Sequence, residues 1–145
     1  MSEVMASNAQ RGTMEEMNVE REIISLEKRA LDRWCKGDPS GCLEISAYDV
    51  TYFDPFVDCR IDGLEALKLY YESLRGKIKV DRYELLNPQV TVHGDLAILT
   101  FNYVSYGGNE QSRWNCTEVY KKLAAGWRII QTHWSLTKPD LKWKD

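Results

Sequence analysis

The stretch WNCTEVYKKLAAGWRIIQTHWSLTKP, residues 114–139, decides the fold of this chain. Its residues alternate in character on both sides of a short turn at residues 123–126, which is typical of two paired antiparallel strands. Successive side chains of a strand point to opposite faces. One face of this hairpin is therefore expected to carry Trp114, Cys116, Glu118, Tyr120, Ile130, Thr132 and Trp134.

Glu118 is the unusual member of that face, because it is a carboxylate among aromatic side chains. Burying a charge without a partner is expensive. Either Glu118 is paired with Arg113, Arg128 or a backbone donor, or the face lines a cavity. In a cavity, desolvation among the aromatic side chains would favour the neutral carboxyl and make it a candidate proton carrier.

Composition excludes several classes of function. The 145 residues fit one domain, and the net charge of −3 lacks the basic stripe of a nucleic-acid-binding protein. No apolar run approaches the roughly 20 residues of a membrane span, so no membrane partner is expected. The four cysteines and two histidines show no metal-ligand spacing and no CxxC. We expect a cytoplasmic protein with reduced thiols, no metal and no cofactor.

The first half of the chain has helical signals. Residues 1–17 lack an apolar stripe and are predicted to be a flexible tail. Asn18 is a predicted N-cap for a helix that ends before Gly37. A short helix is predicted from Asp38-Pro39 to about Ala47, and a third from a capping box at residues 62–65 to Gly76.

Strand signals dominate the second half. A strand over residues 50–54 and a short one over 59–61 precede the third helix. Strands over 78–93, bent near Pro88, and over 96–106 then lead into the hairpin. Helices followed by consecutive antiparallel strands indicate an α+β domain over residues 18–139, with three helices packed on a strongly curved antiparallel sheet and a tail at 140–145.

Several short motifs, in this order, resemble the nuclear transport factor 2-like (SnoaL-like, cystatin-like) superfamily. Within it they are most similar to the association (hub) domain of calcium/calmodulin-dependent protein kinase II and its stand-alone bacterial homologues. The motifs are Lys36-Gly37-Asp38, Phe53-Asp54-Pro55, Asp62-Gly63-Leu64, Tyr71-Glu72-Ser73-Leu74, Leu86-Asn87-Pro88, Thr117-Glu118-Val119-Tyr120, Gly126-Trp127 and His133-Trp134-Ser135.

The resemblance implies a cone-shaped fold with a pocket and a tendency to form oligomers, but no kinase activity of the chain itself. Hub domains carry arginines on the sheet that favour anions, whereas Tyr103, Glu118 and Trp134 stand at those positions here. The expected pocket is thus aromatic and acidic. The superfamily also includes ketosteroid isomerase, scytalone dehydratase and SnoaL-type cyclases, which place an acid/base group in the cone, although fold alone does not imply activity.

Candidate ligand-binding residues follow from strand parity and the resemblance, with Glu118 as the candidate catalytic residue. Asp54 could also simply cap the turn at Pro55, and Tyr103 could be an ordinary core tyrosine. His133 should point away from the pocket, and His93 should lie in a polar turn. The set is Tyr52, Asp54, Tyr103, Trp114, Glu118, Thr132 and Trp134.

The opposite face of the sheet mixes polar and apolar residues, a composition that fits a protein–protein interface with a second copy of the chain. Its predicted members are Ile98, Thr100, Asn102, Val104, Asn115, Thr117, Val119, Ile129, Gln131 and His133.

Two functions remain open from sequence. One is a hub-like, self-associating protein that binds a small molecule. The other is a cofactor-independent isomerase, dehydratase or cyclase with Glu118 as proton carrier.

Overall fold

The computed structural model describes residues 2–138, and describes side chains from residue 14 onward. The predicted tail at 140–145 lies outside this range. The elements in chain order are α1 (Ser2–Trp34), α2 (Ser40–Glu44), β1 (Ser46–Phe53), β2 (Ile61–Asp62), α3 (Leu64–Leu74), β3 (Arg82–His93), β4 (Leu96–Gly107), β5 (Glu110–Leu123) and β6 (Gly126–Leu136).

The described strands form one sheet in the order β2-β1-β6-β5-β4-β3. β3 to β6 are joined by consecutive hairpins and are antiparallel, whereas β1 runs parallel to β6. The sheet is therefore mixed rather than wholly antiparallel. A hairpin makes two consecutive strands antiparallel. β1 and β6 are not consecutive, because most of the chain lies between them, so the sequence pattern did not fix their relative direction. The α+β class predicted from the sequence is confirmed.

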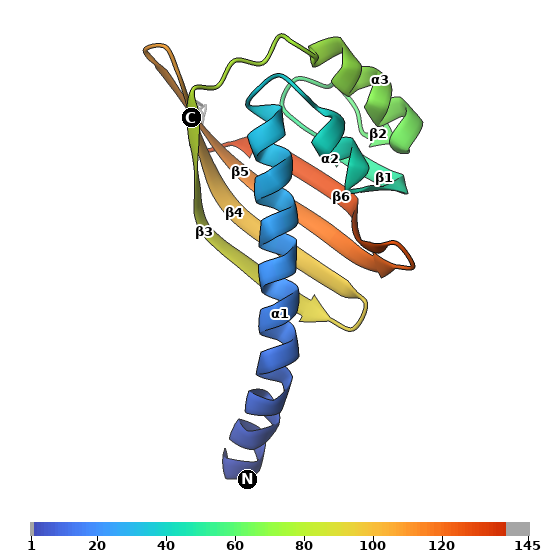
Figure 1. Ribbon diagram of the computed structural model, residues 1–145, viewed down its shortest axis with the longest axis vertical. Helices are drawn as coiled ribbons and strands as arrows, with labels where there is room; N and C mark the ends of the chain where they lie inside the picture. Colours follow the sequence, from blue (N-terminus) through green and yellow to red (C-terminus); the bar gives the residue numbers. More distant parts are fainter. Residues whose placement is uncertain (1, 139–145) are drawn as a thin grey trace, which may run out of the picture.

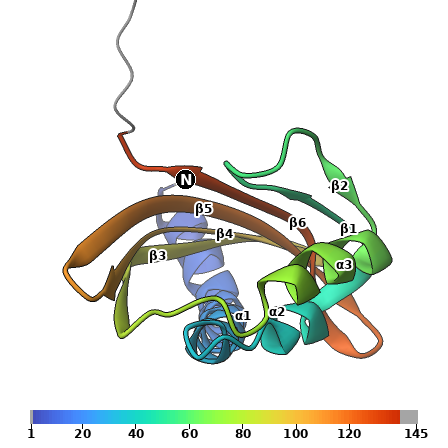
Figure 2. The same cartoon turned by 90° about the horizontal axis from the view of Figure 1, so that it is seen from above.

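All three helices cover one face of the sheet. Figure 2 shows the sheet curving over α1, α2 and α3, which lie together on its concave side. The core between these layers holds Ile23 and Leu31 from α1, Leu67 from α3, and Leu99 and Tyr120 from the sheet, all at most 3% exposed. Helix and sheet thus bury one face each.

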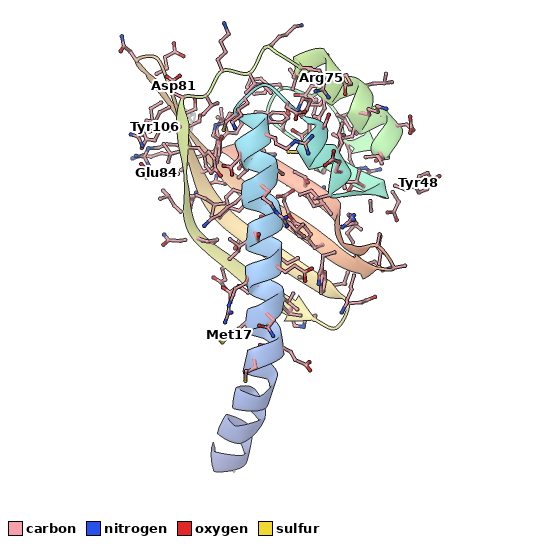
Figure 3. The ribbon with its side chains drawn as sticks, viewed as in Figure 1. Met17, Tyr48, Arg75, Asp81, Glu84 and Tyr106 are labelled. Carbon is pink, nitrogen blue, oxygen red and sulfur yellow. The ribbon has the colours of Figure 1, made fainter. Side chains whose placement is uncertain are left out.

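α1 is longer than the sequence indicated. Its backbone is helical from Ser2, so Asn18 lies inside the helix and does not cap it. No proline interrupts residues 2–34, so nothing in the backbone forces a start at Asn18. The N-terminal part projects beyond the sheet (Figure 1), and Met17 lies on this projecting stretch (Figure 3). Met14 is 74% exposed there.

The starts of the two shorter helices differ in detail from the prediction. Asp38 Oδ1 accepts the backbone N–H of Ser40, but α2 begins at Ser40 and ends at Glu44. The capping box at residues 62–65 is not formed, because Asp62 belongs to β2 and binds Arg60, and Gly63 precedes α3 without a side-chain cap. Asp62 is held in the strand by its pairing with Thr51.

A bulge in β6 changes the predicted faces of the hairpin. Val119 pairs with Gln131 and Tyr120 pairs with Ile129, so β6 has one extra residue at this point. The alternation therefore slips, and Ile129 rather than Ile130 points to the core, where it is 3% exposed. The sequence assignment of these two isoleucines was wrong. β3 has a similar irregularity at Asn87, as expected near Pro88.

The convex face of the sheet carries most of the predicted mixed surface. Thr100, Asn102, Thr117 and His133 are exposed there, and Ile98 is 38% exposed. Val104, which was assigned to the same surface, is only 2% exposed. The face has no covering element within the described chain (Figure 2).

Candidate functional site

A cavity of about 500 Å³ lies between the helices and the concave face of the sheet. This volume is within the usual range for small-molecule sites. The lining comes from all three helices and most strands, and consists of Glu27, Leu31, Trp34, Cys42, Ile45, Ser46, Tyr52, Asp54, Phe56, Tyr70, Tyr71, Leu74, Ile78, Val80, Tyr103, Ser105, Trp114, Glu118, Ile129, Thr132 and Trp134.

Every residue predicted to bind a ligand lies on this cavity. The sheet brings together side chains that are far apart in sequence, because β1 adjoins β6 and β6 adjoins β5. Their part in ligand binding remains a prediction, whereas their shared location is a property of the fold. The residues are Tyr52, Asp54, Tyr103, Trp114, Glu118, Thr132 and Trp134.

Glu118 lines the cavity and is only 3% exposed. It faces Thr132 directly across the β5–β6 pair, and the Thr132 hydroxyl donates to Glu118 Oε2 at 2.7 Å. Its other oxygen, Oε1, is the one buried side-chain N or O atom in the described chain that lacks a hydrogen-bond partner. A buried acceptor without a hydrogen-bond donor lowers the stability of the folded protein, so Oε1 is the atom of this site that still needs a donor.

Glu27 of α1 is the charged residue that acts on Glu118, and sequence reasoning missed it. It is 4% exposed, and the Tyr120 hydroxyl donates to Glu27 Oε2 at 2.7 Å. Burial, and then the adjacent Glu27 carboxyl, raise the pKa of Glu118 well above its usual value. Burial and the neighbouring carboxyl both disfavour the charged form, so Glu118 keeps its proton to a higher pH than an exposed glutamate does.

Neither arginine considered as a partner reaches Glu118. Arg128 donates to the backbone carbonyls of Trp127 and Ala125 near the β5–β6 turn. Arg113 lies beside Gln111. The carboxyl group therefore lies on a cavity and is not neutralised by either cation.

Asp54 forms a second polar centre on the same cavity. The hydroxyls of Tyr52 and Tyr70 donate to its Oδ2 at 2.8 and 2.6 Å. Its Oδ1 accepts the backbone N–H groups of Phe56 and Val57 at 2.7 and 3.2 Å. Asp54 thus stabilises the turn after β1, as one reading of the sequence held, and also fixes two tyrosines on the cavity wall.

Aromatic rings form much of the remaining wall. Trp134 makes edge contacts with Trp114 and Tyr103, with ring centroids 6.1 and 5.5 Å apart. The ring centroids of Phe56 and Trp114 are 6.0 Å apart, and Phe56 is 74% exposed, so this part of the wall reaches the protein surface. The Tyr103 hydroxyl is 3.4 Å from Cys35 Sγ, so it is partly satisfied within the protein.

Of the described cysteines and histidines, Cys42 is the one that lines the cavity, and its thiol is a poor nucleophile. Burial raises the pKa of the Cys42 thiol well above its usual value, which disfavours a thiolate on the cavity wall. His133 is exposed on the convex face, where its ring lies 5.1 Å from Phe53, and it points away from the cavity as predicted. His93 is exposed as well, but it is the last residue of β3 and lies beside the predicted turn rather than in it.

Glu27 and Tyr70 had faint signals in the sequence. Ile23, Glu27, Ala30 and Leu31 share the helical face that packs on the sheet, so an acidic residue interrupts an apolar stripe. Tyr70 directly precedes the core residue Tyr71. A charged residue inside an apolar stripe indicates that its side chain has a buried partner. Among the described residues, Glu118 is the other buried charged residue.

The described residues hold no cluster of three or more His, Cys, Asp or Glu side chains arranged for a metal ion. Within residues 2–138, no helix is both long and apolar enough to cross a membrane.

Comparison with solved structures finds the same fold in proteins of several kinds. A candidate ketosteroid isomerase from Parabacteroides distasonis ATCC 8503 is 45% identical, with 81% of this chain and 86% of that chain covered and a TM-score of 0.74. The hub of CaMKII from S. rosetta is 23% identical, with coverage of 81% and 95% and a TM-score of 0.67. A candidate dehydratase of the nuclear transport factor 2-like family from Streptomyces avermitilis is 16% identical, with coverage of 83% and 98% and a TM-score of 0.68.

A comparison with proteins of curated function found no match. The family model for the calcium/calmodulin-dependent protein kinase II association domain matches residues 19–138, nearly the whole of the described domain. The match spans the cavity and both of its polar centres. The chain therefore belongs to the calcium/calmodulin-dependent protein kinase II association domain family and has the nuclear transport factor 2-like fold.

Proposed function

We propose that the chain is a self-associating protein that binds a small, largely apolar molecule in its cavity. The observation that carries this proposal is Glu118 Oε1, a buried acceptor without a partner on the wall of an aromatic cavity of about 500 Å³. A ligand that donates a hydrogen bond to this atom would satisfy it. Aromatic walls with few oriented polar groups are the usual composition of ligand pockets.

A binding experiment with a pocket-filling variant tests this proposal. Neutral 1-naphthalenemethanol is the probe, and quenching of tryptophan fluorescence reports binding because Trp34, Trp114 and Trp134 line the cavity. Ser105→Phe fills part of the cavity and should abolish binding. Ser112→Phe, on the cross-strand neighbour of Ser105 but outside the lining, should retain it. Equal binding by both variants, or no binding by the wild type, contradicts the proposal.

Self-association is proposed through the convex face of the sheet, with a second copy of the chain as the occupant. Asn102 Nδ2 donates to Asn115 Oδ1, and Asn115 Nδ2 donates to Ser135 Oγ, so this exposed face is ordered by a ladder of side chains. Ile98 adds exposed apolar surface. Several relatives are hub or association domains, which supports assembly of this family member.

Sedimentation velocity at micromolar concentration tests the assembly. The wild type should sediment as a dimer or larger species, and Thr117→Lys should shift it toward the 16.8 kDa monomer by placing like charges across the interface. Ser73→Lys is the matched control, because Ser73 is an exposed residue of α3, and it should leave assembly unchanged. A monomeric wild type would contradict this part of the proposal.

Acid/base catalysis is the second candidate function, and the Glu27–Glu118 pair favours it. Burial and the neighbouring Glu27 raise the pKa of Glu118 well above its usual value, and a raised carboxyl pKa is the usual route to a group that exchanges protons with a substrate. In an isomerase, Glu118 in its ionised form would take a proton from a carbon next to a carbonyl, leaving an enolate, and the protonated carboxyl group would then return the proton to another carbon. The 45% identical relative described as a candidate ketosteroid isomerase supports this class of reaction.

Proton exchange at carbon tests the catalytic candidate without knowledge of the substrate. 2-Tetralone in D2O would be followed by NMR with and without the protein. Catalysis predicts faster deuterium incorporation with the wild type and the background rate with Glu118→Gln. Equal rates for the wild type and Glu118→Gln would argue against Glu118 as proton carrier for this class of ketone.

A further inference from the structure

The charges on the cavity wall are all of one sign. Glu27, Asp54 and Glu118 supply carboxyl groups, and none of the lining residues, all in the described part of the chain, is Lys, Arg or His. The faces of tryptophan and tyrosine rings also attract cations. Such a wall repels a carboxylate or phosphate and favours a positive group.

The two polar centres differ in what they can offer a ligand. Asp54 already accepts two tyrosine hydroxyls and two backbone N–H groups, so its oxygens are occupied. Glu118 accepts only the Thr132 hydroxyl, and its Oε1 has no donor. The acceptor that a ligand can satisfy is therefore the buried Glu118 Oε1.

We propose that the ligand is a protonated amine on a flat apolar body, that its ammonium group donates to Glu118 Oε1, and that its binding releases the proton held by the Glu27–Glu118 pair. This inference rests on the proposed function and names its ligand class. No covalent bond to carbon forms or breaks: the carboxyl proton passes to solvent, and the ammonium replaces it as the hydrogen-bond donor.

Proton release follows from the surroundings of Glu118. The titratable groups that face it are Glu27 from α1, Cys42 from α2, Tyr71 from α3, and Cys116 and Tyr120 from β5. None of them is basic. Without a ligand, a second negative charge at this site has no compensation, so the pair keeps its proton. An ammonium group supplies the missing positive charge, and Glu118 then ionises.

Three probes of one shape isolate the effect of charge. They are 1-naphthylmethylamine, 1-naphthalenemethanol and 1-naphthoate, which are cationic, neutral and anionic at pH 7. The amine should bind roughly ten- to a hundredfold more tightly than the alcohol, the size expected of one charge-assisted hydrogen bond. The carboxylate should bind more weakly than the alcohol.

Calorimetric titration at pH 7 in phosphate and in Tris counts the protons exchanged, because the two buffers differ in ionisation enthalpy. The amine should release about one proton per bound ligand, and the alcohol close to none. Glu118→Gln should abolish the release and reduce the amine affinity to that of the alcohol. Glu110→Gln, an exposed position on the same strand, is the matched control and should behave as the wild type.

The outcomes separate this inference from the proposed function. Alcohol and amine binding with equal affinity, without proton release, would overturn the amine assignment and leave small-molecule binding intact. Tighter binding of the carboxylate would overturn it as well. If no probe binds, the proposed function fails too. The two-buffer comparison on the wild type needs no variant, so the test holds even if Glu118→Gln folds poorly.

Discussion

Replacing Glu118 by glutamine should change how the stability of the protein depends on pH. The glutamine amide keeps the shape of a protonated carboxyl group, but it cannot ionise. Burial and Glu27 raise the folded-state pKa of Glu118 above the value of 4.5 that applies to an unfolded glutamate. The folded protein therefore binds a proton more tightly than the unfolded chain does.

This difference in proton binding sets the sign of the pH dependence of the unfolding free energy. The contribution of Glu118 is fully present below about pH 4.5 and is lost as the pH rises through the folded-state pKa. Over that window the wild type loses about 1.4 kcal/mol of unfolding free energy per pH unit relative to the variant. Between pH 5.5 and 7.5, the unfolding free energy of the variant should therefore rise by up to roughly 3 kcal/mol relative to that of the wild type.

Urea unfolding at pH 5.5, 6.5 and 7.5, followed by tryptophan fluorescence, measures this difference. Subtracting the wild type from the variant at each pH cancels the other titrating groups. Glu110→Gln, at an exposed site, should give a flat difference. If Glu118→Gln instead costs roughly 3–5 kcal/mol at pH 7.5, Glu118 is an ionised partner of a buried cation, and the argument for a proton-holding site fails.

Three further perturbations have defined outcomes. Thr132→Val removes the donor to Glu118 Oε2, so it should cost about 1–3 kcal/mol in urea unfolding and move the pH dependence of stability to higher pH; an unchanged midpoint would contradict this contact. Tyr52→Phe should cost more than Tyr70→Phe in the same assay, because both donate to Asp54 but only Tyr52 is fully buried; the reverse order would contradict the burial argument. Deleting residues 1–17, where α1 projects beyond the sheet, should leave the melting temperature nearly unchanged, and a large drop would show that this segment packs against the fold.

The sequence predicted the local structure of the hairpin well, since strand alternation depends only on neighbouring residues. It placed Trp114, Glu118, Thr132 and Trp134 on one face, and the structure has all of them on the cavity. The same rule failed for Ile129 and Ile130 at the bulge in β6, because one extra residue exchanges the two faces without a clear sequence signal.

The partner of Glu118 could not be predicted in the same way. Glu27 lies 91 positions earlier, on a helix whose angle across the sheet is set by the packing of the whole core. The arginines considered instead were close in sequence but lie elsewhere in the fold. Local patterns identified a buried carboxyl group, and only tertiary packing identified the second carboxyl beside it.

A crystal structure of the protein grown with 1-naphthylmethylamine tests the central claim most directly. The account predicts electron density for the ring system among the aromatic side chains of the cavity, with the amine nitrogen within hydrogen-bonding distance of Glu118 Oε1. A cavity that contains only ordered water at saturating amine, or a probe bound only outside the cavity, would contradict it.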